Sequence, residues 1–506
     1  MTERLFDPPA DPRPRPWREI AIAVGAVLAV FAAWLSVAEP VVPIALAFGL
    51  IFLIFAFRWP FVPCILFIIF SFLRIPEVFP VLLNLKIPLL LAVLTIAVIG
   101  WHLFFLRTMK VFWTRELKIF ALFFFFCTVS VVFAKSKDLA FTFWADVFVK
   151  IGLMTFVVAW ATRKPEDFSL ISRSFCVFGS VVAMVAIYNW MNGIGLVEGS
   201  RVTIGRNIRS LLGDPNDLAL ALLFPFSFAA ALLMGRCGWA DRLLGAVACG
   251  TIFWGIMCTQ SRGGLLGLAA VAAVIGSRFV KSKLVLIGGG LVCLFILFAA
   301  AGISGRSSGG ASEGAIVDES SEGRLTAWRA ATSMAIHNPL TGVGIANFTA
   351  NYFEYSDTWD GKPHAVHSTW FGILGEIGVP GFVTLMVLVT CMWRMCLHSL
   401  KAAQAPEVDP RLKMSAVALL AGLASFCVSG TFLTQGTTWP LYVILALSVA
   451  LDRALAPPDV EGEADFLPPP RPAPRAAVPR ARTPPPPGDG GGREQGGQGE
   501  QGGHGS

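Results

Sequence analysis

The sequence predicts an all-α, polytopic membrane protein with about 12–14 transmembrane helices and a large loop on the outer face. Composition is the first indication, because the 506 residues are 55% hydrophobic, only 14% charged, and include 41 phenylalanines. Such a mixture lies far outside the range of soluble globular domains. The second indication is that apolar runs of spanning length recur along almost the whole chain.

Each apolar run is long enough to cross a bilayer or falls slightly short of that length. Runs 60–73 and 264–277 are the short ones and could be re-entrant, which sets a lower limit of about twelve spans. The first run is expected to be an uncleaved span, since the polar segment before it is long for a signal peptide. The expected spans are 20–38, 41–57, 60–73, 87–106, 119–134, 141–161, 169–190, 217–235, 241–259, 264–277, 284–301, 368–392, 414–433 and 437–452.

Basic residues in the short loops predict the topology and the organisation of the chain. If fourteen spans alternate, the strongest Lys and Arg clusters fall on one side, which is then the cytoplasm. This explains the net charge of +7 without a nucleic-acid partner. The expected regions are a cytoplasmic segment 1–19, transmembrane helices over 20–301 with an outer loop at 191–216, a large outer loop 302–367, transmembrane helices over 368–452, and a disordered Pro-, Gly- and Arg-rich cytoplasmic tail 453–506.

Two features of the predicted spans bear on possible chemistry. The 10 cysteines show no CxxC and no paired spacing, so neither a disulfide framework nor a zinc site is expected. Asp146 and Lys150 are four residues apart in a span and could pair on one helix face. Charges within spans are often functional, although a structural pair is the simpler interpretation here.

Arginines on the outer face break the usual charge bias of membrane proteins. Three of them lie in RVTIGRNIRSLLGDPND, and Arg262 in TQSRGG lies at the outer end of a predicted span. Cations kept on this side suggest an anionic ligand, while headgroup contacts or pairing with Asp214 and Asp217 are the alternative. The three arginines of the first outer loop are Arg201, Arg206 and Arg209.

The large outer loop contains a predicted amphipathic helix. The segment EGRLTAWRAATSMAIHNPL places Leu325, Trp328 and Ala331 on one face, and the helix is expected to end at Asn338-Pro339. A helix of this kind is expected to lie on the outer leaflet. Its basic residues, Arg324 and Arg329, could add to a phosphate site, although a solvated helix face is the default interpretation.

Two histidines precede the next span in KPHAVHSTWFGILGEIGVPG, which covers 362–381. His364 and His367 could form a metal site with Glu376, but Glu376 lies more than two turns inside the span. Three ligands at metal-binding spacing are therefore not evident, and the outer loops contain no DxD-like acidic pair. A mechanism without a metal and without a cofactor is expected.

These motifs together resemble the bacterial O-antigen ligases, within the superfamily of O-antigen ligases and polymerases. His367-Ser368, nine residues, and then Gly378-Val379-Pro380-Gly381 fit the family signature H-[N/S/Q]-x9-G-x-x-G. The segments GDPNDLAL (213–220), SRGGLLG (261–267) and EGRLTAWRAATSMAIHNPLTGVGIANF (322–348) also resemble family segments, in the correct order. The resemblance covers about residues 200–390. Ser368 stands where the family commonly has Asn.

The resemblance implies a metal-independent glycosyltransferase of the bacterial inner membrane, with its active site facing the periplasm. Such enzymes transfer a glycan from undecaprenyl pyrophosphate to a hydroxyl of lipid A–core, of a growing glycan or of a protein. The same superfamily therefore also includes polymerases and protein O-glycosylation ligases. A lipid-linked oligosaccharide flippase is the alternative from another class, but the sequence shows no internal repeat and few midplane charges.

The resemblance also implies roles for individual residues. His367 matches the motif histidine and is expected to act as a general base or to orient the acceptor, while Arg262 is the first choice to neutralise the leaving pyrophosphate. A second arginine is expected from the first outer loop, with Arg209 and Arg206 ranked above Arg201. His364 and Glu376 are supporting candidates, and Gly378 and Gly381 are expected to permit close helix approach.

Overall fold

The computed structural model describes residues 41–456, with gaps at 110, 209, 236–237, 279, 281, 283, 286–287, 289, 293–294, 296–320, 360 and 362–363. The predicted segment 1–19, the predicted span 20–38 and almost all of the predicted tail 453–506 lie outside these residues. The same holds for much of the predicted span 284–301, for the Gly- and Ser-rich stretch 302–320, and for Arg209.

Helices account for the regular structure of the described residues, in which no β-strand occurs beyond an isolated bridge between Val197 and Arg201. The first half contains α2 (Val41–Arg58), α3 (Phe61–Phe72), α4 (Ile75–Val78), η1 (Pro80–Leu85), α5 (Ile87–Phe104), α6 (Arg115–Val132), α7 (Lys137–Phe143), η2 (Trp144–Phe148), α8 (Val149–Ala161) and α9 (Pro165–Met191). The second half contains η3 (Arg206–Ile208), η4 (Leu211–Gly213), α10 (Pro215–Met234), α11 (Trp239–Thr259), α12 (Arg262–Gly276), α14 (Ser321–His337), α15 (Phe348–Tyr355), α16 (Thr369–Ala402), α17 (Pro410–Ser429), η6 (Gly430–Phe432) and α18 (Trp439–Leu455).

The described helices confirm the predicted multi-pass, all-α membrane fold. Seven of them are long and apolar enough to cross a membrane, or up to eight if the bent α2–α3 pair counts as one span. That pair is bent by 114°, so the predicted short run 60–73 belongs to a broken span or a re-entrant loop. The other short run, 264–277, corresponds to α12, an apolar helix of 15 residues.

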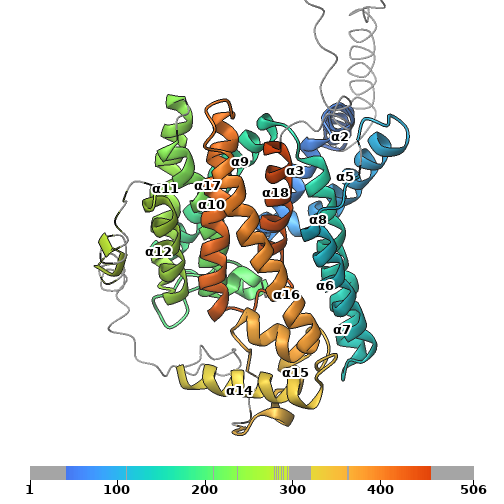
Figure 1. The fold of residues 1–506 in the computed structure, drawn as a ribbon, viewed down its shortest axis with the longest axis vertical. Helices are drawn as coiled ribbons and strands as arrows, with labels where there is room; N and C mark the ends of the chain where they lie inside the picture. The colour runs from blue at the N-terminus through green and yellow to red at the C-terminus, as the bar shows by residue number, and fades with distance from the viewer. Residues whose placement is uncertain are drawn as a thin grey trace, which may run out of the picture. The chain divides into compact units, whose positions relative to one another are not determined.

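Helix α10 lies in the middle of the bundle and packs against α9, α11, α12 and α17 (Figure 1). Small residues let its neighbours approach closely, as is common between membrane helices. A Cβ added at Gly264 of α12 would lie 2.7 Å from the Ala219 side chain of α10. Because α10 is enclosed on most sides, the position of its N-terminal end, which starts at Pro215, is fixed by packing.

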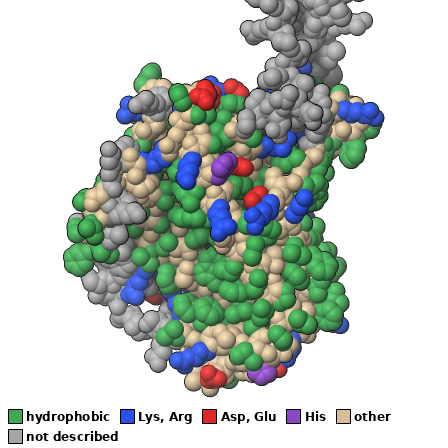
Figure 2. All heavy atoms as spheres, viewed as in Figure 1, with side chains coloured by type: hydrophobic (Ala, Val, Ile, Leu, Met, Phe, Trp, Pro, Cys, Tyr) green, Lys and Arg blue, Asp and Glu red, His purple; other side chains and the backbone are tan. Residues whose placement is uncertain are grey.

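Apolar side chains form a band across the surface, between two zones that contain the charged side chains (Figure 2). Large exposed apolar residues on the outer helices include Phe125 of α6 and Val383 of α16. In water such a surface would be an aggregation hazard, whereas in a bilayer it faces the hydrocarbon core. The band is the surface expected of a membrane-embedded bundle.

Helices α14 and α15 lie across one end of the bundle, where α16 begins (Figure 1). This end is called the α14 end below. Helix α14 is present as predicted, but its buried face is rotated from the predicted one: Ala331 is buried, whereas Leu325 is half exposed. The reason is close packing on α16, where a Cβ added at Gly375 would lie 3.2 Å from the Ala331 backbone. Only small side chains fit that contact.

Candidate active site at the α14 end

Three helices begin at the α14 end, each capped by a side chain from one of the motifs found in the sequence. Asp214 accepts a hydrogen bond from the backbone N–H of Asn216 (2.7 Å) at the start of α10. Ser261 accepts one from the Gly264 N–H (3.0 Å) at the start of α12, and Ser368 caps α16. Helix N-termini carry partial positive charge, so their convergence suits an anionic group.

Hydrogen bonds join these three helix starts to one another. Ser261 Oγ donates to Asn216 Oδ1 at 2.8 Å, which links α12 to α10. Gln435, in the loop after α17, donates from Nε2 to Asp217 Oδ1 (2.6 Å) and from its backbone N–H to Thr369 Oγ1 (3.2 Å). The first bond reaches α10 and the second reaches α16, so the three motifs form one polar assembly.

Arg201 is held inside this assembly and is only 1% exposed. Its Nη2 donates to Asn216 Oδ1 (2.9 Å) and its Nε donates to the Thr259 carbonyl (3.3 Å). A backbone bond from Val202 N–H to the Cys258 carbonyl (3.2 Å) fixes the preceding loop against the end of α11. The guanidinium is thus a fixed, desolvated positive charge at the starts of α10 and α12.

The other predicted arginines differ from Arg201 in their surroundings. Arg262 is the first residue of α12, directly after Ser261, and its side chain is exposed. Arg206 is exposed in the short helix η3, whose backbone packs against Gly213. Arg209 lies outside the described residues. The structure therefore brings Arg201 and Arg262 to adjoining helix starts, although the sequence ranked Arg201 last in its loop.

His367 lies immediately before the cap of α16 and has a left-handed backbone conformation (φ 44). Such a conformation is uncommon for a residue other than glycine and is frequent at functional sites. The Nε2 atom is buried and has no hydrogen-bond partner among the described residues. Burial lowers the pKa of His367, Asp214 opposes the shift, and the charges of Arg324 and His364 add to it. Burial therefore favours the neutral form of the imidazole.

Helix α14 supports the segment that carries His367. Trp328 Nε1 donates to the Val366 carbonyl at 3.1 Å, and the Trp328 ring stacks on Phe371 with centroids 5.0 Å apart. His364 lies beside the Tyr352 ring of α15, with centroids 5.2 Å apart. These contacts hold the residues on both sides of His367, and they place His364 as a neighbour of the α15 helix.

Glu376 is buried and binds the backbone between α14 and α16. Its Oε1 accepts a hydrogen bond from the Phe348 N–H at the start of α15 (3.0 Å). The main chain of α16 breaks two residues later, at Gly378 (φ 78, ψ −174). Glu376 therefore links the start of α15 to α16. This contact holds the two helices together, and the sequence alone did not predict it.

The turn that follows α14 packs against α16 at the break at Gly378. The Val343 N–H donates to the Gly375 carbonyl (3.0 Å), and the Val379 N–H donates to the Pro339 carbonyl (2.9 Å). A Cβ at Gly378 would lie 2.7 Å from the Pro339 oxygen, so only glycine fits. The sequence predicted close approach of a helix at this glycine, but the partner is the turn after α14.

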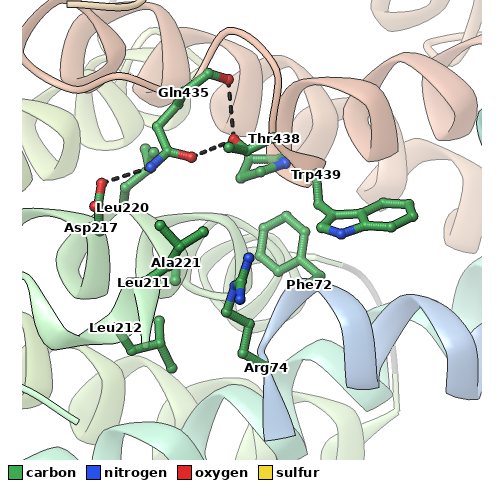
Figure 3. Close-up of a pocket in the computed structure, with 11 residues that line it drawn as sticks. Phe72, Arg74, Leu211, Leu212, Asp217, Leu220, Ala221, Gln435, Thr438 and Trp439 are labelled. Atoms are coloured by element: carbon green, nitrogen blue, oxygen red, sulfur yellow. Dashed lines mark hydrogen bonds between the residues drawn. The ribbon is translucent and has the colours of Figure 1, made fainter. Parts of the chain in front are cut away.

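A small cavity of about 30 Å³ lies behind the polar assembly and is lined by Asp217, Gln435, Arg74 and Trp439 (Figure 3). Arg74 extends towards it from the end of α3 and also pairs with Glu77. Neither Arg74 nor Gln435 was predicted as part of the site. The signal available for Arg74 was the one used for Arg262, a basic residue on the face predicted to be the outer one; Gln435 had no such signal.

Comparison with known proteins identifies the same region. Residues 247–386 match the family described as O-antigen ligase, which confirms the predicted resemblance. The matched segment contains Arg262, Arg324, His367 and Glu376. No curated protein matches the chain.

Proposed function

We propose, from the O-antigen ligase match and the geometry of the α14 end, that this protein transfers a glycan from a lipid-linked pyrophosphate donor to an acceptor hydroxyl. The observation that carries the proposal is the convergence of Arg201, Arg262 and His367 at joined helix starts. The donor is a glycan linked to undecaprenyl pyrophosphate, and the acceptor is a hydroxyl of lipid A–core or of a similar molecule. These identities follow from the family resemblance.

Positive charge at the starts of α10 and α12 supports the leaving-group half of the reaction. As the bond between the anomeric carbon and the phosphate oxygen breaks, negative charge accumulates on the pyrophosphate. The exposed guanidinium of Arg262 can contact the pyrophosphate in bidentate fashion, and the buried guanidinium of Arg201 can stabilise the same charge electrostatically. The Arg201 side chain does not have to reorient when charge develops, because Asn216 and Thr259 already hold its guanidinium in place.

The properties of His367 support the acceptor half of the reaction. A general base must be neutral before it receives a proton, and burial keeps His367 in that form. In the proposed step, Nε2 takes the hydroxyl proton while the acceptor oxygen bonds to the anomeric carbon. The lipid pyrophosphate then leaves with the electron pair of the broken bond, and the proton on His367 is released to solvent.

Charge distribution supports a periplasmic location for the α14 end. Helix α6 begins at Arg115 and helix α16 ends near Lys401, both at the opposite end of the bundle from α14. Arg163 and Lys164 precede α9, and Arg411 and Lys413 begin α17. Basic residues concentrate on the cytoplasmic side of membrane proteins. The site would then face the periplasm of the inner membrane.

Deletion of the gene, followed by analysis of the accumulated glycans, tests this proposal and separates the acceptors. Full-length polymer left on the carrier lipid supports a ligase, single repeat units support a polymerase, and loss of protein-bound sugar alone supports a protein ligase. A lipid-linked glycan confined to the cytoplasmic leaflet would instead support a flippase and overturn the transferase. Complementation with His367→Ala should fail, whereas Arg411→Ala at the opposite end should restore the glycan.

A further inference from the structure

We propose that a cavity at the end of the bundle opposite α14 binds the headgroup of a zwitterionic aminophospholipid, phosphatidylethanolamine. The cavity has a volume of about 230 Å³ and lies between the start of α6, the last third of α16 and the end of α18, which pack against one another. The inference does not depend on the proposed function, because no residue of this cavity belongs to the α14 end. The cavity is lined by Arg115, Glu116, Cys391, Arg394, Met395, His398 and Asp452.

Two arginines of this cavity are not engaged by acidic side chains of the described part of the chain. Arg115 begins α6, and Arg394 lies on α16. Among the residues that the structure describes, neither forms an ion pair, whereas Arg411 at the same end of the bundle pairs with Glu166. A guanidinium group can bind a phosphate with two parallel N–H donors. A phosphodiester is therefore a ligand that suits these two side chains.

The same cavity also contains two carboxylates, Glu116 and Asp452. The Oδ1 atom of Asp452 accepts hydrogen bonds from His398 Nδ1 (3.0 Å) and Ser399 Oγ (2.9 Å). Its Oδ2 atom accepts none within the described ranges, so it can receive a donor from a ligand. Two carboxylates would repel a simple anion. A ligand that carries both a phosphate and an ammonium, which has three N–H donors, finds a partner for each charge.

Exposed apolar side chains lead from the cavity along the seam between α6 and α16. On α6, Leu122 follows Arg115 by seven residues, and this spacing keeps both on one face of the helix. On α16, Val387 and Val383 precede Arg394 by seven and eleven residues and share its face. The two helices run antiparallel, so both stripes extend from the cavity in the same direction (Figure 1). All three apolar side chains are exposed, which provides a surface for acyl chains beneath a bound headgroup.

The position of the cavity suits a lipid headgroup rather than a soluble molecule. Charged side chains lie beyond the apolar band at this end of the bundle (Figure 2). Basic pockets between transmembrane helices on the cytoplasmic side bind phospholipid headgroups, and this is the side proposed above for the end opposite α14. A lipid bound here would contact α6, α16 and α18 together. It would therefore stabilise the folded bundle.

Two variants separate the two halves of the headgroup site. Arg394→Gln removes a donor to the phosphate. Asp452→Asn removes the charge that attracts the ammonium, while the asparagine Oδ1 can still accept from His398 and Ser399. Arg411→Gln is the matched control, because it removes an arginine of the same end that is paired outside the cavity. The side chains of Arg394 and Asp452 are at least partly exposed, so both variants should keep the wild-type Tm when no lipid is added.

The experiment measures lipid binding to the purified full-length protein in detergent by native mass spectrometry. Phosphatidylethanolamine is compared with phosphatidylcholine, whose ammonium has no N–H, and with phosphatidylglycerol, which has no ammonium; all three carry the same acyl chains. The wild type should bind phosphatidylethanolamine at least about tenfold more tightly than the other two, the effect of charge-assisted hydrogen bonds to the ammonium.

The variants should change this binding in different ways. Arg394→Gln should lower the affinity for phosphatidylethanolamine by about tenfold, as expected for the loss of a charge-assisted hydrogen bond. Asp452→Asn should lower the affinity for phosphatidylethanolamine but not that for phosphatidylglycerol. Arg411→Gln should bind like the wild type. Equal binding of phosphatidylethanolamine and phosphatidylglycerol to the wild type would overturn the inference, as would wild-type affinity in Arg394→Gln.

Two further measurements test the lipid assignment itself. Glycerophosphoethanolamine, the same headgroup without acyl chains, should bind far more weakly than the intact lipid. If it binds as tightly, the cavity takes a soluble ligand and the assignment fails. Added phosphatidylethanolamine should also raise the Tm of the wild type and of Arg411→Gln, but not that of Arg394→Gln. An equal rise in all three proteins would contradict binding in this cavity.

Discussion

Arg201 at the α14 end and the arginines at the opposite end of the bundle are held in opposite ways. At the α14 end, Arg201 is 1% exposed and bonded to Asn216 and Thr259. At the other end, Arg173 is 53% exposed and pairs with Asp241, and Arg411 pairs with Glu166 near the surface. A desolvated and fixed guanidinium can stabilise a developing charge, whereas an exposed one is screened and mobile. Burial therefore separates Arg201, whose charge is fixed in place, from Arg262 and the surface arginines, which can reorient.

Replacement of His367 should have the largest effect on transfer. His367→Ala removes the proposed base, which should lower the transfer rate by about 10²–10⁴-fold. His364→Ala is the matched control, because this neighbouring histidine lies against Tyr352 and is expected to leave most of the activity. Initial rates with a lipid-linked donor measure both variants. Equal losses in the two would remove the distinction between these histidines.

Replacement of Arg201 or Arg262 should have the next largest effect on transfer, and the two variants should differ in thermal stability. Arg201→Ala and Arg262→Ala should each lower the transfer rate by about 10²–10³-fold, the cost of removing one transition-state donor. Arg201→Ala should also lower Tm, because the buried Asn216 and Thr259 acceptors lose their partner. Arg262 is exposed, so Arg262→Ala should leave Tm unchanged. Thermal unfolding that failed to distinguish the two would contradict the comparison of buried and exposed arginines.

Substitution of Gly378 should have a smaller effect, expressed mainly in stability. Gly378→Ala places a Cβ at φ 78 and within 2.7 Å of the Pro339 oxygen, which should cost about 1–2 kcal/mol from the backbone conformation alone. Gly361→Ala is the control, since Gly361 has a similar φ (82) and nothing within 4 Å. Hydrogen exchange at Val343 and Phe348 should accelerate in the first variant alone. Protection that is equal in both variants would argue against docking of the turn in the α16 break.

Removal of an exposed arginine at the opposite end should have the smallest effect. Arg411 and Glu166 form an ion pair at 2.6 Å, with side chains 42% and 67% exposed. Pairs of this kind contribute at most about 1 kcal/mol to stability. Arg411→Ala should leave both Tm and the transfer rate close to those of the wild type. A large loss of transfer would show that the opposite end takes part in the reaction.

Local patterns in the sequence predicted much of the fold and part of the site. The apolar runs predicted the described membrane helices, and His367 and Arg262 lie at helix starts as expected. The predicted pairing of Asp146 with Lys150 does not occur among the described residues, because the π-helical turn Trp144–Phe148 changes the local spacing. A spacing of four residues indicates a shared face only in a regular α-helix.

Contacts between distant segments could not be predicted from spacing. Arg201 is buried because its loop folds back onto the end of α11. Glu376 bonds to Phe348, which lies 28 residues away in the sequence. Gln435 reaches Asp217 across 218 residues. Nothing in the residues beside Gln435 indicates this contact, so the structure was needed to find it.

We propose that the α14 end performs glycan transfer with His367 as its base and with Arg201 and Arg262 as its anion site. The most direct measurement is the initial transfer rate of purified protein in nanodiscs, from a lipid-pyrophosphate-linked glycan to its acceptor, for variants at both ends. His367→Ala, Arg201→Ala and Arg262→Ala should each fall by at least about a hundredfold, and Arg411→Ala should match the wild type. A wild-type rate for His367→Ala would contradict the account.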